Sequence, residues 1–253
     1  MVSITQGVIL GILQGITEWL PISSTGHLAI AEEIFGLKEF SFAVFLHIAS
    51  ILAVIFIFYR DILNILDFRK KDSLKYIGLI IIALIPAALA GFFLENKIRF
   101  MFSNIFFVGI FFIISGFIIF STKFFKEKKD NVDLKSSLFI GIFQIFGLFP
   151  GISRSGSTIS GGIFCGLKRS EVMKFSFILA IPIIFGAFLL ESRKIVLSEI
   201  SWIILIISFI VTFLTSLFSI KILLKLVKGN KFYFFGFYNL IIGIFVLIWS
   251  FLK

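Results

Sequence analysis

Long apolar stretches, separated by short clusters of charged residues, run through the whole chain. An α-helix needs about 20 residues to cross a hydrocarbon core of roughly 30 Å, and each stretch has or can reach that length. The pattern predicts an all-α integral membrane protein with six spanning helices. They are expected at Phe40–Tyr59, Tyr76–Leu94, Phe100–Thr122, Phe175–Leu190, Ile200–Ile220 and Phe232–Leu252.

Two further apolar stretches, Met1–Ala31 and Ser136–Leu167, are each interrupted by a proline with small polar residues after it. Pro21 comes shortly before Ser-Ser-Thr-Gly, and Pro150 before Ser-Arg-Ser-Gly-Ser. A straight helix of about 32 residues would be roughly 48 Å long, well beyond the hydrocarbon core. Proline removes a backbone donor and clashes with the preceding turn. Both stretches are therefore predicted to fold back inside the membrane as re-entrant helical hairpins.

The two predicted hairpins are similar in sequence. Gly11–Lys38 aligns with Gly141–Lys168 without a gap, and nine of the 28 positions are identical. Each hairpin is followed by three predicted spans, an odd number, so the second copy must enter the membrane inverted. We expect a single polytopic membrane domain (1–253) built as an inverted-topology repeat, with copies at 1–130 and 131–253. Broken segments at matching places in two halves indicate a binding site between them.

The composition excludes a soluble or disordered protein. Hydrophobic residues make up 59% of the chain and charged residues 15%, whereas soluble domains are about 45–50% apolar and about 25% charged. The formal net charge is +10, but the basic residues lie in short loops between apolar stretches, where they set membrane topology. No nucleic-acid partner is therefore expected. The single cysteine, Cys165, is expected to be a packing residue and cannot form a disulfide within the chain.

The basic residues are distributed unevenly between the two ends of the predicted bundle. Loops at 60–75, 123–135, 166–174 and 221–232 hold 17 Lys and Arg residues, and the opposite end holds six. Because strongly basic loops stay in the cytoplasm, we expect a multi-pass protein of the cell membrane with both termini and the site on the extracytoplasmic side. The first hairpin would then enter from outside and the second from inside, and their tips would meet within the membrane.

The first hairpin carries an unusual carboxylate. Glu18 lies three residues before Pro21, and Gln14 lies one helical turn earlier on the same face. A charge at that depth costs about 2.5–3.5 kcal/mol on insertion scales and by default marks a functional site. The alternative is a structural Glu18 that caps a neighbouring helix or pairs with Arg154.

The turn of the first hairpin combines three hydroxyls, a glycine and an imidazole: Ser23, Ser24, Thr25, Gly26 and His27. Alone, this run would be an ordinary helix cap. Because it shares a hairpin with the intramembrane carboxylate, it is a candidate for chemistry instead. The chain's other histidine, in the span that follows, is a lone residue among apolar neighbours and is expected to pack or to support the site.

The turn of the second hairpin supplies groups that bind anions: Ser153, Arg154, Ser155, Gly156 and Ser157. Backbone amides at a helix start form an anion site. The planar guanidinium of Arg154 is suited to phosphate oxygens. Arg154 could instead only neutralise the carboxylate of the first hairpin, and the two roles are compatible.

Together the two tips predict a phosphate site with groups for nucleophilic or acid–base attack. A carboxylate beside phosphate oxygens also suits a hard divalent cation, Mg²⁺ or Ca²⁺, with Glu18 and Gln14 as ligands. The sequence has no HExxH, Walker or Cys-His motif, so zinc and nucleoside-triphosphate chemistry are not expected.

These segments resemble one known family. Gln14–His27 is similar to the first signature of the undecaprenyl-diphosphate phosphatase (bacitracin-resistance) family, including its (E/Q)xxxE element. Pro150–Thr158 resembles the second signature, PGxSRSG, and Phe45–Val54 resembles the segment that follows the first. The similarity extends over essentially the whole chain.

The resemblance implies a membrane hydrolase that removes the terminal phosphate of a C55 isoprenyl diphosphate outside the cell, recycles the lipid carrier of cell-wall (peptidoglycan) synthesis and confers bacitracin resistance. By matching position, Glu18 would serve the metal or the water, and Ser24 would be the nucleophile. His27 would be an acid–base group or a rival nucleophile, and Arg154 would clamp phosphate. The amide of Gln14 cannot be a base, which concentrates the carboxylate role on Glu18.

A second function class stays open at this stage. Inverted repeats with broken helices are also typical of transporters, so the alternative is a transporter or a polyprenyl-phosphate flippase. The Glu, Ser and His groups favour the enzyme, because carrying a phosphate does not need them. Glycines within several spans would also permit a homodimer. Prenyl chain length and the class of organism stay open.

Overall fold

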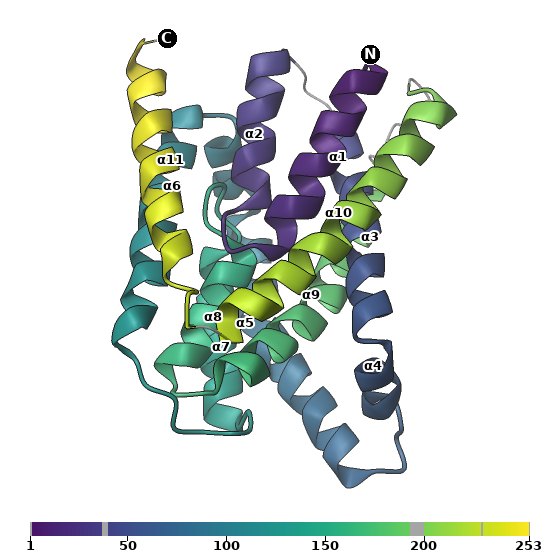
Figure 1. Cartoon of the computed structure of the whole chain (residues 1–253), viewed down its shortest axis with the longest axis vertical. Coiled ribbons are helices and arrows are strands. Elements are labelled where there is room, and N and C mark those ends of the chain that lie inside the picture. The colour runs from purple at the N-terminus through teal and green to yellow at the C-terminus, as the bar shows by residue number, and fades with distance from the viewer. Residues whose placement is uncertain (1, 37–39, 193–199, 229, 253) are drawn as a thin grey trace.

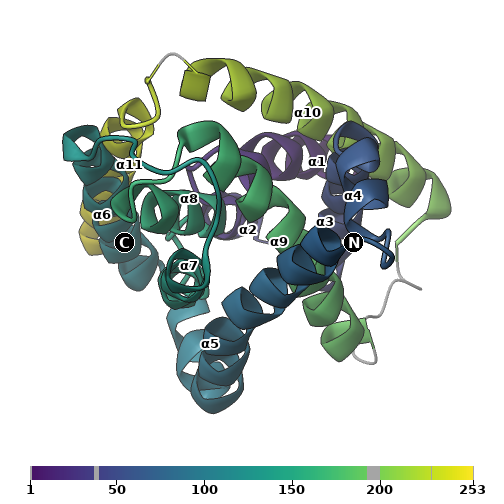
Figure 2. The same ribbon diagram turned by 90° about the horizontal axis from the view of Figure 1, so that it is seen from below.

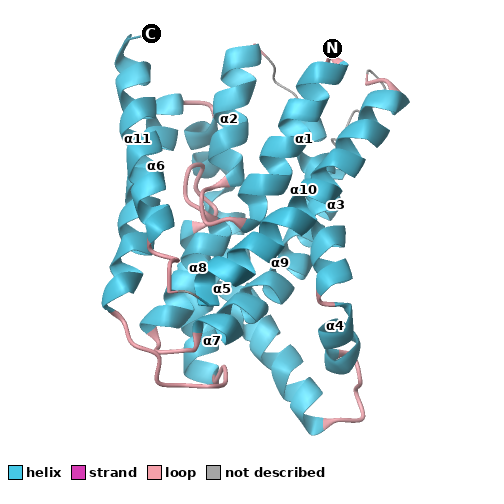
Figure 3. Ribbon diagram, in the orientation of Figure 1, coloured by secondary structure: helices cyan, strands magenta, loops and turns pink. Residues whose placement is uncertain are grey.

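The structure, a computed structural model, describes the chain except residues 1, 37–39, 193–199, 229 and 253. All regular elements in the described part are helices, apart from one isolated bridge between Lys129 and Leu167 (Figure 3). The helices are α1 (Ile4–Trp19), α2 (Ser24–Phe35), α3 (Phe40–Ile57), α4 (Tyr59–Ile65), α5 (Lys71–Phe102), α6 (Ile105–Ser121), the 3₁₀ turn η1 (Thr122–Phe124), α7 (Leu134–Phe146), α8 (Arg154–Phe164), α9 (Arg169–Ser192), α10 (Trp202–Lys228) and α11 (Phe234–Leu252).

The prediction of an all-α membrane fold is confirmed. Five described helices are long and apolar enough to cross a membrane: α5, α6, α9, α10 and α11. A sixth span is present if α3 and α4, which are joined by a bend of 80°, are counted as one. The protein is therefore a multi-pass membrane protein with five or six such helices in the described part of the chain.

Helix α5 is longer than the expected span. It covers 32 residues, although its apolar part is close to the predicted Tyr76–Leu94. The additional turns carry charged residues such as Asp72 at one end and Arg99 at the other, so the helix is longer than a hydrocarbon core of roughly 30 Å requires. Pro86 lies inside this helix without ending it.

The two hairpins enter the bundle from opposite ends. In Figure 1, the first turn of α1 and the last turn of α11 lie at one end, and α1 and α2 descend from it. The α7–α8 hairpin rises from the other end, where the loops between α4 and α5 and between α6 and α7 also lie. The turns of both hairpins lie inside the molecule (Figure 3). This is the geometry that an inverted repeat requires, and the repeat itself stays a prediction.

Each hairpin packs on a spanning helix of the other half of the chain. Helix α1 packs along α10, and α7 packs along α5. Seen from below, α10 runs along one side of the bundle and α5 along the opposite side, with α8, α9 and the α1–α2 hairpin between them (Figure 2). In the predicted repeat, α1 corresponds to α7 and α10 to α5, so the two packings are equivalent.

Two aligned glycines permit these packings. A Cβ added to Gly11 would lie 2.9 Å from the carbonyl oxygen of Ser208 on α10. A Cβ added to Gly141 would lie 2.6 Å from the carbonyl oxygen of Ala83 on α5. Both contacts are with backbone, which cannot move aside by a rotamer change. The shared glycine therefore reflects close helix packing in both hairpins.

We expect Gly141→Ala to destabilise the fold. The added methyl group would overlap the α5 backbone, and overpacking of this kind typically costs about 1–3 kcal/mol. Gly78→Ala is the matched control. Gly78 lies on α5, the helix that Gly141 packs against, and nothing lies within 4 Å of a Cβ added there. Thermal unfolding in detergent should show a lower Tm for Gly141→Ala only. Equal Tm values for the two variants would contradict the packing argument.

Glycines also permit close packing between α6 and α11. These helices pack closely, and a Cβ on Gly243 would lie 2.9 Å from the carbonyl oxygen of Gly109. A Cβ on Gly236 would lie 2.8 Å from the carbonyl oxygen of Gly116. Packing within one chain accounts for these four glycines, so they do not indicate a dimer interface.

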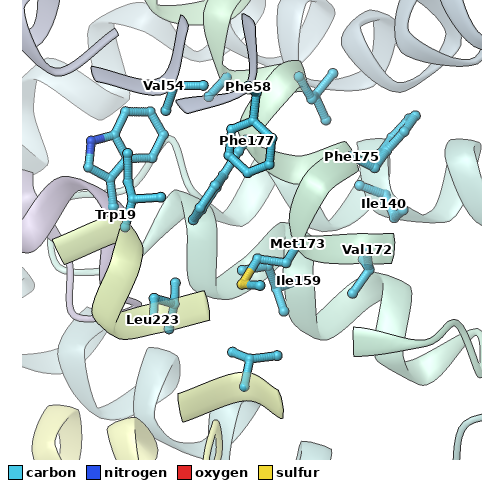
Figure 4. Packing of buried hydrophobic residues seen from close by; sticks show 14 of the residues in the cluster. Trp19, Val54, Phe58, Ile140, Ile159, Val172, Met173, Phe175, Phe177 and Leu223 are labelled. Atoms are coloured by element: carbon cyan, nitrogen blue, oxygen red, sulfur yellow. The ribbon is translucent and has the colours of Figure 1, made fainter. Parts of the chain in front are cut away.

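An aromatic cluster holds the end of α1 in place (Figure 4). The Trp19 ring lies edge-on to Phe177, with centroids 5.1 Å apart, and the Phe58 ring also lies edge-on to Phe177, with centroids 5.9 Å apart. Trp19 is completely buried. Because Glu18 precedes Trp19 in the same turn, this packing also fixes the position of the Glu18 backbone.

Candidate active site

Local sequence explains why both hairpins turn where they do. Helix α1 ends at Trp19 because Pro21 cannot continue it. Helix α2 begins after Ser23, whose hydroxyl accepts a hydrogen bond from the Gly26 amide at 3.2 Å. In the second hairpin, Ser153 caps α8 in the same way. Each turn therefore directs the start of a helix, with its unpaired amides, toward the interior of the bundle.

The two tips touch at glycines. A Cβ on Gly26 would lie 3.0 Å from the Cα of Gly151 and closer still to the Phe112 ring. Gly151 has a φ of 101°, a conformation in the left-handed half of the map that favours glycine. Side chains here would separate the hairpins, so the glycines bring polar groups from both tips into one site.

The Glu18 carboxylate is the centre of this site and is 6% exposed. Its Oε2 accepts hydrogen bonds from the Ser24 hydroxyl at 2.6 Å and from Gln14 Nε2 at 3.1 Å. Its Oε1 accepts a hydrogen bond from Arg154 Nη2 at 2.6 Å. The predicted convergence of a carboxylate, a carboxamide, a hydroxyl and a guanidinium is thus present in the structure.

Arg154 contacts both Glu18 and Trp19, and its Nη1 donates no hydrogen bond to the described residues. Its guanidinium pairs with Glu18 and lies over the Trp19 ring, 5.5 Å from the centroid. Its Nη1 is buried and has no hydrogen-bond partner among the described residues. A buried donor without an acceptor is costly, and a phosphate oxygen would satisfy it. Arg154 therefore has the contacts for both roles considered from the sequence.

His27 lies in a separate part of the tip. Its Nδ1 is 2.8 Å from the Ser23 carbonyl oxygen, and its Nε2 is 2.8 Å from the hydroxyl of Tyr238 on α11. A carbonyl oxygen only accepts, so Nδ1 carries the proton and Nε2 accepts from the tyrosine hydroxyl. Both ring nitrogens are thus engaged, and no described contact joins His27 to Glu18.

Most of the remaining candidate hydroxyls form hydrogen bonds within their own turns. Ser23 and Thr25 oxygens lie 3.3 Å apart, and Ser153 and Ser155 oxygens lie 3.1 Å apart. The amides of Gly26 and Gly156 are taken up by the two capping serines. Ser157 is different, because its hydroxyl is buried and has no hydrogen-bond partner in the part of the chain that the structure describes.

Three further side chains contribute to the site: His47, which the sequence predicts to pack or to support the site, and Ser50 and Tyr238, which were not singled out from the sequence. His47 on α3 lies with Nε2 3.4 Å from Glu18 Oε2, and Ser50 one turn later accepts a hydrogen bond from Gln14 at 3.3 Å. Their position in Phe45–Val54, the third segment of the family resemblance, was the available signal. Tyr238 lies in a plain apolar span, and nothing in its local sequence indicates a contact with His27.

The oxygen donors of the site are few. No group of three or more His, Cys, Asp and Glu side chains that could hold a metal occurs among the described residues. Gln14 Oε1 is buried and lacks a hydrogen-bond partner among the described residues, so it is the one uncommitted oxygen beside Glu18. Such a set cannot enclose an ion by itself. It suits a Mg²⁺ ion that takes its other ligands from substrate phosphates and water.

Comparison with known proteins shows the family of the chain. The family described as bacitracin resistance protein BacA matches residues 7–245. An undecaprenyl-diphosphatase of Methanococcus vannielii is 39% identical over 251 residues, which cover 96% of this chain and 99% of the relative. One from Thermosipho africanus is 39% identical over 243 residues, covering 94% and 96%. One from Treponema denticola is 38% identical over 268 residues, covering 98% and 99%. The chain therefore belongs to the BacA bacitracin-resistance family.

Proposed function

We infer that this protein is an undecaprenyl-diphosphate phosphatase, which converts a C55 polyprenyl diphosphate to the monophosphate and inorganic phosphate. The observation that carries this inference is the Ser24 hydroxyl, 2.6 Å from the Glu18 carboxylate, which in turn binds Arg154. The named relatives, identical at 38–39% of positions over nearly full length, support the same substrate.

The site geometry favours attack by Ser24. Glu18 Oε2 accepts the hydroxyl proton as the Ser24 oxygen forms a bond to the terminal phosphorus. The bond between that phosphorus and the bridging oxygen breaks, and the lipid monophosphate leaves with the bond's electron pair. Water then attacks the phosphorus of the phosphoserine, the bond between phosphorus and the Ser24 oxygen breaks, and Glu18 returns its proton to that oxygen as inorganic phosphate leaves. His27 is a weaker candidate for the attack, because both of its nitrogens are engaged.

Arg154 has a defined part in this reaction. Its free Nη1 would bind an oxygen of the terminal phosphate while Nη2 stays on Glu18. Negative charge grows on the phosphate oxygens as the bridging bond breaks, and a guanidinium already in place stabilises it without reorganisation. The aromatic face of Trp19 holds the guanidinium plane in position.

A divalent cation, Mg²⁺ or Ca²⁺, fits the site as a partner of the diphosphate. Glu18 and Gln14 would hold it through one carboxylate and the uncommitted amide oxygen. When bound, it would neutralise phosphate charge and polarise the phosphoryl group.

The proposed setting is the cell membrane, with the site open to the extracytoplasmic side. The more basic end of the chain, with 17 Lys and Arg residues against six, supports a cytoplasmic position for the loops between α4 and α5 and between α6 and α7. Phosphate release there would return the lipid carrier to cell-wall synthesis. Bacitracin resistance is the phenotype named for the family.

Purified protein in detergent is expected to release inorganic phosphate from undecaprenyl diphosphate. EDTA should abolish release, and added Mg²⁺ or Ca²⁺ should restore it, because Glu18 and Gln14 present oxygens beside the phosphates. A transporter or flippase needs two compartments and would release no phosphate in micelles. Full activity after thorough stripping with EDTA would remove the cation from the mechanism and leave the hydrolase.

Arg154→Ala is expected to lower kcat/KM by about 10²–10³, a loss of roughly 2.7–4 kcal/mol by analogy with removal of one oxyanion donor. Arg154→Lys should be a poor substitute, because an ammonium cannot bind carboxylate and phosphate through one planar group. Phosphate release is measured beside Tm in detergent for both variants.

The stability measurement separates the two roles of Arg154. If Arg154 only pins the hairpins together, Arg154→Ala should unfold at lower temperature, and the double variant with Glu18→Gln should recover the Tm. If it binds phosphate, the Arg154→Ala single variant should have a low kcat/KM even when it is normalised to the folded fraction. A stable Arg154→Ala protein with near-normal turnover would exclude the phosphate role.

A further inference from the structure

Ser23, the residue before the proposed nucleophile, has an unusual backbone conformation. Its φ is 65° and its ψ is 96°. A positive φ is uncommon outside glycine, and this ψ lies beyond the small left-handed region that other residues can enter. Among the described residues other than glycine, only Ser23 and Asn230 have a positive φ. Strained backbone of this kind occurs at active sites and persists only where the surrounding contacts enforce it.

The second hairpin shows that this strain is not needed to cap a helix. Ser153 stands at the aligned position and caps α8 through the equivalent hydrogen bond to a glycine amide, yet its φ is −71°. The two hairpins differ four residues later, where His27 aligns with Ser157. The strained cap thus occurs in the hairpin that carries both the histidine and the proposed nucleophile.

His27 holds the strained residue by its carbonyl. The Ser23 carbonyl oxygen accepts a hydrogen bond from the imidazole Nδ1 at 2.8 Å and from the His27 backbone amide at 3.2 Å. The second bond is the ordinary helical one, whereas the first depends on the side chain. Ser23 is 2% exposed, so water has little access to replace a lost donor. The imidazole is therefore a specific restraint on the strained backbone.

Helix α11 holds this histidine and the turn together. The Tyr238 hydroxyl donates to His27 Nε2 at 2.8 Å, and the two rings are stacked with centroids 5.8 Å apart. The Phe112 ring of α6 lies edge-on to the imidazole at 5.3 Å. The neighbouring Asn239 is completely buried and donates to the Pro21 carbonyl at 2.8 Å. Two consecutive residues of α11 therefore restrain the turn on both sides of the strained serine.

We propose that α11 positions the nucleophile through these hydrogen bonds, and that His27 is a positioning residue and not an acid–base group. Tyr238 fixes His27, which in turn keeps Ser23 in its strained conformation. That conformation directs the next residue, Ser24, so that its hydroxyl donates to Glu18 at 2.6 Å. An Nε2 that accepts from a tyrosine hydroxyl has no proton to give. The proposal rests on the function inferred above, with Ser24 as the attacking group.

Two substitutions of His27 separate positioning from proton transfer. His27→Asn places an amide nitrogen where Nδ1 was, so it can still donate to the Ser23 carbonyl. His27→Gln places one where Nε2 was, and neither amide can transfer a proton at neutral pH. Phosphate release from undecaprenyl diphosphate is measured with purified protein in detergent, beside Tm.

We expect the two His27 variants to differ. His27→Asn should keep kcat within about tenfold of the wild-type value, the effect of one hydrogen bond. His27→Gln should lower kcat by about 10² or more, the cost of a displaced reacting group. KM should stay close to that of the wild type in both, because the groups proposed to bind phosphate are unchanged.

Tyr238→Phe tests the contribution of α11. It removes one hydroxyl and keeps the ring that stacks on the imidazole, so kcat should fall about tenfold with KM unchanged. Added to His27→Asn, it should have no further effect, because the hydroxyl acts only through the imidazole. Tyr233→Phe is the matched control, since Tyr233 contacts Lys123 and Phe234 with its ring. Its kcat should equal that of the wild type.

Every outcome bears on the proposal. Equal kcat values for His27→Asn and His27→Gln, whether both fall or both stay normal, would overturn it and leave the phosphatase intact. A normal kcat for Tyr238→Phe, or a loss that lies wholly in KM, would overturn it as well. If a His27 variant does not fold, Tyr238→Phe against Tyr233→Phe decides. Wild-type protein that releases no phosphate would refute the proposed function, and the positioning proposal would fall with it.

Discussion

Glu18→Gln is expected to lower phosphate release by about 10³–10⁴, at the upper end of what a general base contributes. The amide keeps the size of the side chain and still accepts a hydrogen bond from Ser24, but it cannot take the hydroxyl proton. It also loses the charge that orients the Arg154 guanidinium. The measurement is kcat for undecaprenyl diphosphate, normalised to the folded fraction in detergent.

Stability provides the control for Glu18→Gln. Removing one partner of a buried ion pair typically costs about 3–5 kcal/mol, so the Tm should fall as well. Glu18→Asp keeps a carboxylate on a shorter side chain, and it should recover part of the activity and of the Tm. Near-normal turnover of folded Glu18→Gln protein would show that another group accepts the proton.

The hairpins could be predicted because their signals are local. Each turn combines a proline, a capping serine two or three residues later and a glycine three residues after the serine, and the structure ends and restarts a helix at those points. Proline alone does not have this effect. Pro86 and Pro182 lie inside continuous helices, because they have apolar neighbours and no capping residue to start a new helix.

The meeting of Glu18 and Arg154 was predictable for a different reason. The residues are 136 positions apart, and only the similarity of the two hairpins indicated that their tips would come together. In the alignment, Ser24 and Arg154 occupy the same place, the first residue of the second arm after a capping serine. Glu18 has no acidic counterpart, because Leu148 stands at its place. The two hairpins therefore carry different residues at aligned positions, Ser24 opposite Arg154 and Glu18 opposite Leu148. These differences bring a hydroxyl, a carboxylate and a guanidinium together in one site.

Contacts between the hairpins and the spanning helices were not predictable. Periodicity identifies His47 and Tyr238 as members of apolar helices, and it gives no information on which face meets which neighbour. The Tyr238 hydroxyl reaches His27 across 211 positions of sequence. The bend between α3 and α4 was also missed, since no proline or glycine marks it.

The most decisive single change concerns Ser24. Ser24→Ala is expected to lower kcat by about 10⁴ or more, as removal of a nucleophile does in other hydrolases. The Glu18–Arg154 pair does not depend on this hydroxyl, so the Tm should stay close to that of the wild type. Ser208→Ala is the matched control, because Ser208 is a buried serine of α10 outside the site.

Trapping distinguishes attack by Ser24 from the alternatives. Wild-type protein quenched in acid during turnover should carry phosphate on a peptide that contains Ser24, and the Ser24→Ala protein should carry none. If His27 or water attacks instead, Ser24→Ala will retain measurable turnover and the wild type will yield no phosphoserine. The geometry supports the first outcome: the Ser24 hydroxyl already donates to Glu18 at 2.6 Å, whereas the His27 nitrogens are committed to Ser23 and Tyr238.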